Sequence, residues 1–101
     1  MSSRRTMKSS TKRWSATAHL DSEEARAAYL AAALEDGDPA VVTAALGDIA
    51  RAKGMTRVAR KAGLGRESLY KALSANGNPE LATVLRVVQA LGLRLNAVPA
   101  D

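Results

Sequence analysis

At 101 residues and a net charge of +5, the chain has the length of one domain with a modest core. The absence of cysteine excludes disulfides and thiolate metal sites, and the scarcity of aromatic residues leaves leucine, valine and alanine to fill the core. No apolar run approaches the roughly 20 residues of a membrane helix, and no signal peptide is visible. We therefore expect a soluble cytoplasmic protein.

Residues 1–19 differ in composition from the rest of the chain. They carry five basic side chains and no acidic one, are rich in serine and threonine, and show no apolar period. This composition predicts a disordered basic arm. Such an arm could lie along DNA phosphates, or it could be a leader without a role. His19, the single histidine, has no partner in the sequence that would indicate a catalytic or metal-binding role.

Apolar residues at helical spacing predict two helices in the first half of the chain. The first begins after Ser22, a good N-cap residue, and runs to about Glu35. The second begins at Asp38-Pro39, where aspartate is the N-cap and proline takes the first helical position, and it runs to about Ala52.

Residues 55–73 predict a helix, a tight turn and a second helix. Val58 and Ala62 lie on the apolar face of the first helix, and Leu69 and Leu73 lie on that of the second. Gly63, between them, can adopt the left-handed backbone conformation of a helix end. This spacing is typical of a DNA-binding helix-turn-helix.

The distribution of charge agrees with this interpretation. Residues 51–71 carry seven basic side chains and one acidic, a net charge of +6, whereas residues 21–48 carry seven acidic and one basic, a net charge of −6. A basic surface on a helix-turn-helix is the electrostatic footprint of a protein that binds DNA phosphates. The alternative is that the basic helices only present a solvated face.

The C-terminal part contains one more predicted helix, followed by a segment in which apolar residues recur at every second position. Residues 80–91 have the strongest amphipathic pattern in the chain and predict a fifth helix. Leu93 to Val98 alternates apolar and polar residues, which predicts a short β-strand. A lone strand must pair with a twofold mate or another protein's sheet, or remain a tail. We therefore predict an all-α domain of five helices with a C-terminal strand over residues 20–98, followed by a tail at 99–101.

Several short segments along these predicted helices resemble a known protein family more specifically than the helix-turn-helix alone. They are Ala28-Tyr29-Leu30, residues 33–39, residues 44–55, Ala62-Gly63-Leu64, residues 66–74, Gly77-Asn78-Pro79 and Leu91-Gly92-Leu93. With them, about four fifths of the chain resembles the helix-turn-helix antidote proteins of bacterial addiction modules, the HigA-like antitoxins of type II toxin–antitoxin systems. The resemblance implies a lambda-repressor-like fold, repression by binding the module's own double-stranded operator DNA, and neutralisation of a RelE/ParE-superfamily toxin by direct binding.

The second helix of such a motif lies in the major groove with its N-terminal residues at the base edges. Arg66 could grip a guanine edge, and Glu67 could accept a hydrogen bond from cytosine. Tyr70 could contact a base, or it could equally be a packing residue beside Leu69 and Leu73. The base-reading candidates are Gly65, Arg66, Glu67, Ser68 and Tyr70; the phosphate-binding candidates are Arg57, Arg60, Lys61 and Lys71.

Two positions depart from the pattern of the family. Gly65 stands where the recognition helix usually has a serine or threonine cap, and Arg57 stands where a glutamine often holds a phosphate. Glycine can still act as the N-cap of a helix, and the positive charge of Arg57 can replace glutamine in holding a phosphate.

Because one module contacts only about half a turn of the groove, a homodimer on a palindrome is expected. The dimer candidates are the fifth helix and the strand that follows it, with Leu93, Leu95 and Ala97 on the strand.

Other functions are compatible with parts of this pattern. The first alternative is a stand-alone helix-turn-helix repressor with no toxin partner, and another is an interaction module whose acidic half, residues 21–48, docks a basic protein. Helix N-terminal dipoles explain some of this acidity without a partner. We expect no enzyme, cofactor or metal, because the sequence has no histidine–carboxylate cluster, no nucleophile elbow and no phosphate-cradling glycine loop.

Overall fold

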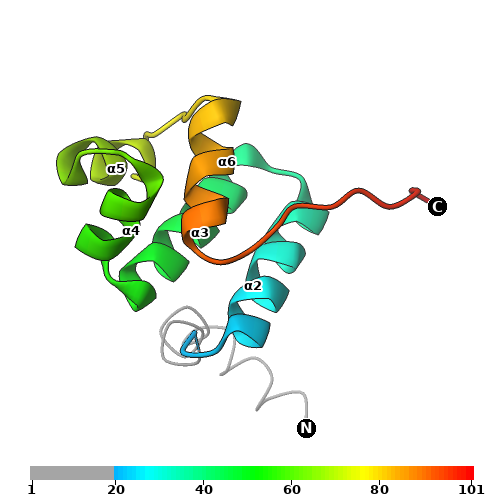
Figure 1. Cartoon of the computed structure of the whole chain (residues 1–101). Helices are drawn as coiled ribbons and strands as arrows, with labels where there is room; N and C mark the ends of the chain where they lie inside the picture. The colour runs from blue at the N-terminus through cyan, green and yellow to red at the C-terminus, as the bar shows by residue number, and fades with distance from the viewer. Residues whose placement is uncertain (1–19) are drawn as a thin grey trace, which may run out of the picture.

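The structure, a computed structural model, describes residues 20–101 and has five α-helices in that part. They are α2 (Glu23–Asp36), α3 (Pro39–Lys53), α4 (Met55–Ala62), α5 (Arg66–Ala72) and α6 (Leu81–Ala90) (Figure 1). The prediction of an all-helical chain with five helices is thus confirmed for these residues, and the predicted basic arm at 1–19 lies outside them. Each helix between Leu20 and Asp101 is too short or too polar to cross a membrane.

The ends of α2 and α3 follow from side-chain caps. The Ser22 hydroxyl accepts a hydrogen bond from the Ala25 N–H at 3.1 Å, and the Asp38 carboxylate accepts one from the Ala40 N–H at 2.9 Å. Both N-caps were predicted and are confirmed. Gly37, with φ of 81°, ends α2 in the left-handed conformation and turns the chain back, so that α3 packs along α2.

All five helices of the described part contribute to one core. The largest fully buried side chains are all branched aliphatic: Leu46, Ile49, Leu69, Leu91, Val58, Val87 and Val88. Helix α4 packs against α3, α5 and α6, and therefore connects the α2–α3 hairpin to the C-terminal helix. Alanines at the contacts allow the helices to approach closely.

One polar network ties α2 to α3. The Tyr29 hydroxyl donates a hydrogen bond to Asp48 at 2.6 Å, and the Arg51 guanidinium donates one to the other carboxylate oxygen at 3.2 Å. Asp48 is only 3% exposed, so these partners offset the cost of burying its carboxylate. The network also fixes the orientation of the Tyr29 ring.

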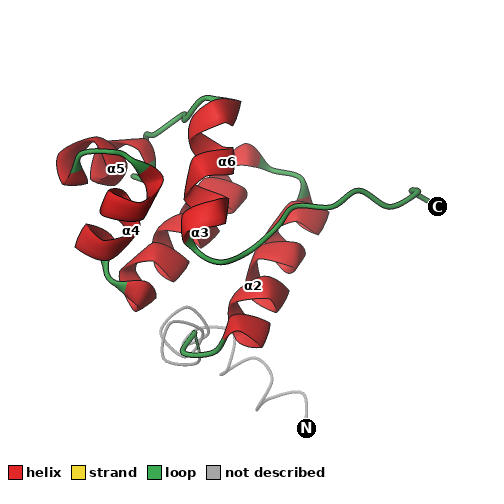
Figure 2. Cartoon of the chain, viewed as in Figure 1, coloured by secondary structure: helices red, strands yellow, loops and turns green. Residues whose placement is uncertain are grey.

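The prediction of a C-terminal β-strand is wrong for the described chain. Figure 2 shows residues 93–101 as a loop, and no strand occurs between Leu20 and Asp101. Leu93 and Leu95 are half-buried against the helical core, whereas Ala97 and Val98 are exposed. The apolar residues at alternate positions 93 and 95 therefore pack on the helices of the same chain. With no neighbouring strand to pair its backbone groups, the extended segment forms no sheet.

Candidate nucleic-acid interface

The turn between α4 and α5 is built on glycine. Gly63 has φ of 72°, a conformation that costs other residues energy, and its N–H donates to the Arg60 carbonyl oxygen at 3.2 Å. The Leu64 N–H donates to the Ala59 carbonyl oxygen at 2.9 Å, which closes the end of α4. Gly65 is extended and precedes α5 as its N-cap, without a side-chain hydrogen bond.

The inner faces of the two helices anchor them to the core. Met55, Val58, Ala59 and Ala62 of α4 are buried, and Leu69 is the buried residue of α5. Leu73, directly after α5, is buried as well. The remaining side chains of α5 therefore project from a helix that is held from one side.

The structure leaves every base-reading and phosphate-binding candidate exposed. Among residues 20–101, none of the basic candidates forms an ion pair. The candidates are Gly65, Arg66, Glu67, Ser68 and Tyr70 at the start of α5, with Arg57, Arg60, Lys61 and Lys71 around them. Exposed, unpaired cations are available to an anionic partner.

Tyr70 contacts Arg66 on the outer face of α5. The Arg66 guanidinium carbon lies 5.4 Å from the centroid of the Tyr70 ring, and an Arg66 nitrogen lies 3.5 Å from the Tyr70 hydroxyl oxygen. The tyrosine is 41% exposed, so it is not part of the core beside Leu69 and Leu73. The cation–π contact restricts the orientation of the arginine, because the ring lies one helical turn further along α5.

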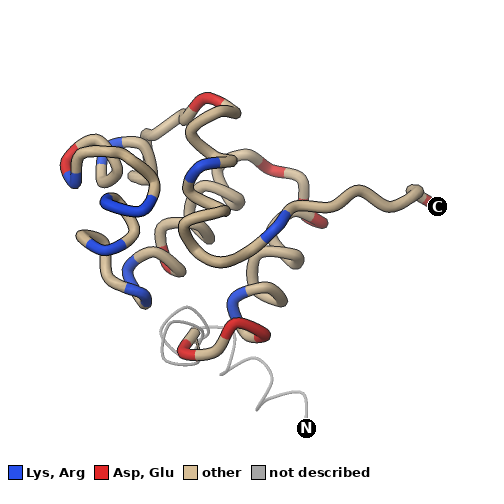
Figure 3. Tube along the Cα trace, in the orientation of Figure 1, with Lys and Arg blue, Asp and Glu red and all other residues tan. Residues whose placement is uncertain are grey.

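Positive charge extends from α4 to the end of α3. Figure 3 shows lysine and arginine positions distributed over α4, α5 and this neighbouring end. Burial lowers the pKa of the Lys53 ammonium below its ordinary value, and the positive charges of Arg26 and Lys61 lower it further. The Glu23 carboxylate opposes this lowering of the Lys53 pKa.

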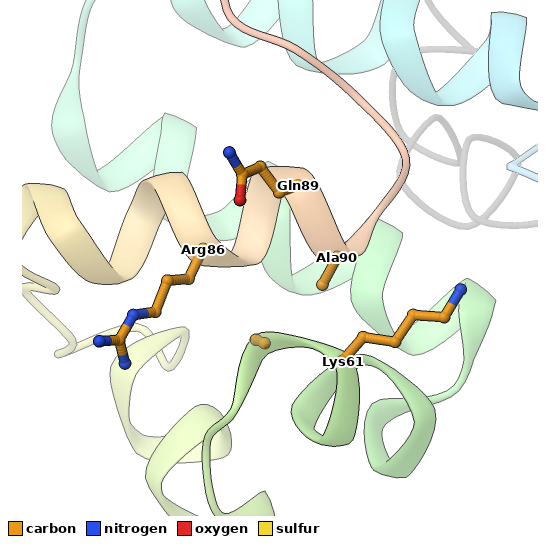
Figure 4. A pocket seen from close by; sticks show the side chains of 5 residues that line it. Lys61, Arg86, Gln89 and Ala90 are labelled. Atoms are coloured by element: carbon orange, nitrogen blue, oxygen red, sulfur yellow. The ribbon is translucent and has the colours of Figure 1, made fainter.

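Sequence reasoning missed two residues of α6 that lie beside Lys61. A hollow of about 290 Å³ between α4 and α6 is lined by Lys61, Ala62, Arg86, Gln89 and Ala90. Figure 4 shows Arg86 and Lys61 reaching out from the two helices in different directions, so their charged ends do not converge. The sequence shows only that Arg86 and Gln89 are polar residues of an amphipathic helix. It does not show that this helix packs on α4.

The predicted dimer candidates differ in their exposure. Leu93 and Leu95 pack against the core of their own chain, while Ala97 is exposed. On α6, Leu81 and Leu85 are 69% and 43% exposed and lie one helical turn apart. This exposed leucine pair lies on the helix that the sequence already offered as a dimer candidate, and it is available for self-association.

Comparison with known proteins adds a family assignment. A family model described as "Probable addiction module antidote protein" matches residues 10–99. An uncharacterized protein of Haemophilus influenzae is 51% identical to the chain over 76 residues, which cover 75% of this chain and 78% of the relative. No solved structure matches the chain.

Proposed function

The chain belongs to the family of probable addiction module antidote proteins, and from this we propose that it is the antitoxin of a type II toxin–antitoxin module. The observation that carries the proposal is the family match over residues 10–99 of the 101. In this proposal the chain acts by binding alone, with no catalytic step or cofactor of its own. It neutralises a toxin of the RelE/ParE superfamily in the cytoplasm by direct contact, and it represses its own operator.

The first half of this proposal is tested in living cells. Expression of the gene adjacent to this one should arrest growth, and co-expression of this chain should restore growth. The two products should also purify as a complex. Growth that is unaffected by the adjacent gene would contradict the antitoxin assignment and favour a stand-alone repressor.

For the operator, we propose that α4 and α5 act as a helix-turn-helix with α5 in the major groove of double-stranded DNA. The exposed N-terminal residues of α5 support this, because that end of a recognition helix meets the base edges. Arg66 can bind the O6 and N7 atoms of guanine with its planar fork, which the Tyr70 ring already orients. Glu67 and Ser68 lie beside it.

Phosphate contacts are proposed for Arg57, Arg60, Lys61 and Lys71, and also for Arg86 of α6. Lys61 and Arg86 flank one hollow but diverge, which suits successive phosphates of a strand better than one small anion. Gln89 can donate from the same hollow. This arrangement would extend the DNA footprint beyond α4 and α5.

Replacing Arg86 by alanine is expected to weaken binding to operator and random duplex alike, because a phosphate contact carries no base information. The slope of log K against log salt concentration should become shallower by about 1. Fluorescence anisotropy over a salt series measures both quantities. Arg94→Ala, at an exposed position on the C-terminal segment, is the matched control and should leave the slope unchanged. A loss confined to the operator would contradict the phosphate role.

We also propose that two copies bind a palindromic operator. One copy covers too little groove for tight binding, and the paired copies would set half-sites a helical turn apart. Leu81 and Leu85, together with Leu93, Leu95 and Ala97, are the candidates for the contact between copies.

A further inference from the structure

An open groove runs between α2 and α3 near the turn that joins them. Its volume is about 320 Å³, and its lining includes Tyr29, Ala32, Ala33 and Asp36 from α2 with Val41 and Ala44 from α3. These residues recur at spacings of three and four along each helix, so the two stripes face one another. The groove exists because most of the facing side chains are alanines, too short to fill the space between the helices.

The groove has a fixed, largely apolar surface. Val41 is 40% exposed, a large fraction for a valine beside the core. The hydrogen bond of 2.6 Å from the Tyr29 hydroxyl to buried Asp48 holds the tyrosine ring in place as one wall. A preformed apolar surface can accept a side chain of another molecule with little loss of conformational entropy.

One carboxylate, that of Asp36, lines the groove, and helix stability does not explain an acidic residue at this position. Glu35 and Asp36 lie in the last turn of α2, where the helix dipole is negative and disfavours carboxylates. That turn contains no basic residue, and within residues 20–101 neither carboxylate forms an ion pair. Helix dipoles account for Glu23, Glu24 and Asp38, but not for Glu35 and Asp36, and Asp36 lies in the lining of the groove beside its apolar surface.

We propose that this groove is the docking site for the toxin, and that it takes a segment of the toxin with an apolar side chain flanked by lysine or arginine. The inference rests on the proposed antitoxin function. A second copy of this chain fits less well, because a twofold contact at the groove would bring the Asp36 carboxylates of both copies toward one another. In Figure 1, α2 lies across the body from α4 and α5, so a toxin on α2 leaves the proposed DNA-binding face uncovered.

The test measures binding of the purified product of the adjacent gene to full-length variants of this chain by calorimetry. Ala32→Trp fills the groove, and Asp36→Lys reverses the charge of its one lining carboxylate. Each should raise Kd by about tenfold or more, the size expected when a central contact of about 1.4 kcal/mol is lost. The matched controls are Ala27→Trp and Glu24→Lys, at exposed positions away from the groove on the same helix, and they should change Kd less than about twofold.

The other outcomes separate the two proposals. If wild type and all four variants bind alike, the groove proposal is wrong while toxin binding stands. If wild type does not bind the adjacent gene product, both proposals fall. If Ala32→Trp converts a dimer into a monomer in sedimentation, the occupant is a second copy and the toxin site is refuted. Thermal unfolding of Asp36→Lys, a surface change, distinguishes lost docking from lost folding.

Discussion

Replacing Leu69 by alanine is expected to lower the free energy of unfolding by roughly 2–5 kcal/mol, the range for a leucine deleted from a packed core. Leu69 is fully buried and is the buried residue of α5 itself. A domain of this size is stabilised by only about 5–15 kcal/mol in total, so the loss is a large fraction. Urea denaturation followed by circular dichroism measures it.

The same substitution should also weaken operator binding beyond the effect of lost stability. Helix α5 has seven residues, too few to persist in water without its packing, so a weakened anchor allows it to fray.

The control for the stability measurement is Lys71→Ala, at an exposed position on α5, which should change the free energy of unfolding by less than about 0.5 kcal/mol. Equal stability of the Leu69→Ala variant and wild type would show that α5 is not held by this side chain.

Replacing Arg66 by alanine is expected to cost roughly 1–3 kcal/mol in operator affinity and to relax the preference at one base pair. Arg66 is exposed at the start of α5 and stacks on Tyr70, which orients its guanidinium. Arg66→Lys should not restore the preference, since an ammonium lacks the planar fork that matches guanine. Binding to a library of operator variants measures the preference at each position.

Arg60→Ala is the matched control, because it removes an arginine from the phosphate-binding candidates. It should weaken binding to operator and random duplex equally. If Arg66→Ala also causes equal losses on both duplexes, the base-reading role of Arg66 is wrong.

The helices were predictable because their signals are local. Ser22 and Asp38-Pro39 are start signals that act within one turn, and Gly63 is favoured wherever a helix ends in the left-handed conformation. Alternation at Leu93–Val98 misled because a period of two reports burial of alternate side chains, not the presence of a neighbouring strand. Whether an extended segment becomes a strand depends on a partner strand, and residues 20–101 provide none.

The candidate site was predictable only where it lies on one element. The candidates on α5 surround the buried Leu69, so their exposure could be expected from that one helix: Arg66, Glu67, Ser68, Tyr70 and Lys71. Arg86 is distant from Lys61 in sequence and reaches the same hollow only through the packing of α6 on α4. The α2–α3 groove likewise depends on how two alanine-rich stripes face each other, a relation that no single helix reveals.

The two proposed binding surfaces lie on different parts of the chain. Basic α4 and α5 carry the DNA-binding candidates, and the groove beside Asp36 carries the candidate toxin contact. Opposite charges at the two surfaces would direct polyanionic DNA and a basic toxin to different places. Such a chain could hold both partners at once.

The central claim is that the α4–α5 face recognises one DNA sequence, and footprinting of the full-length protein on DNA upstream of its own gene tests it most directly. We expect protection of a palindrome with half-sites about 10 base pairs apart, centre to centre, and affinity for it at least about a thousandfold above that for random duplex at physiological salt. Equal affinity for upstream and random DNA, with no protected site, would contradict it.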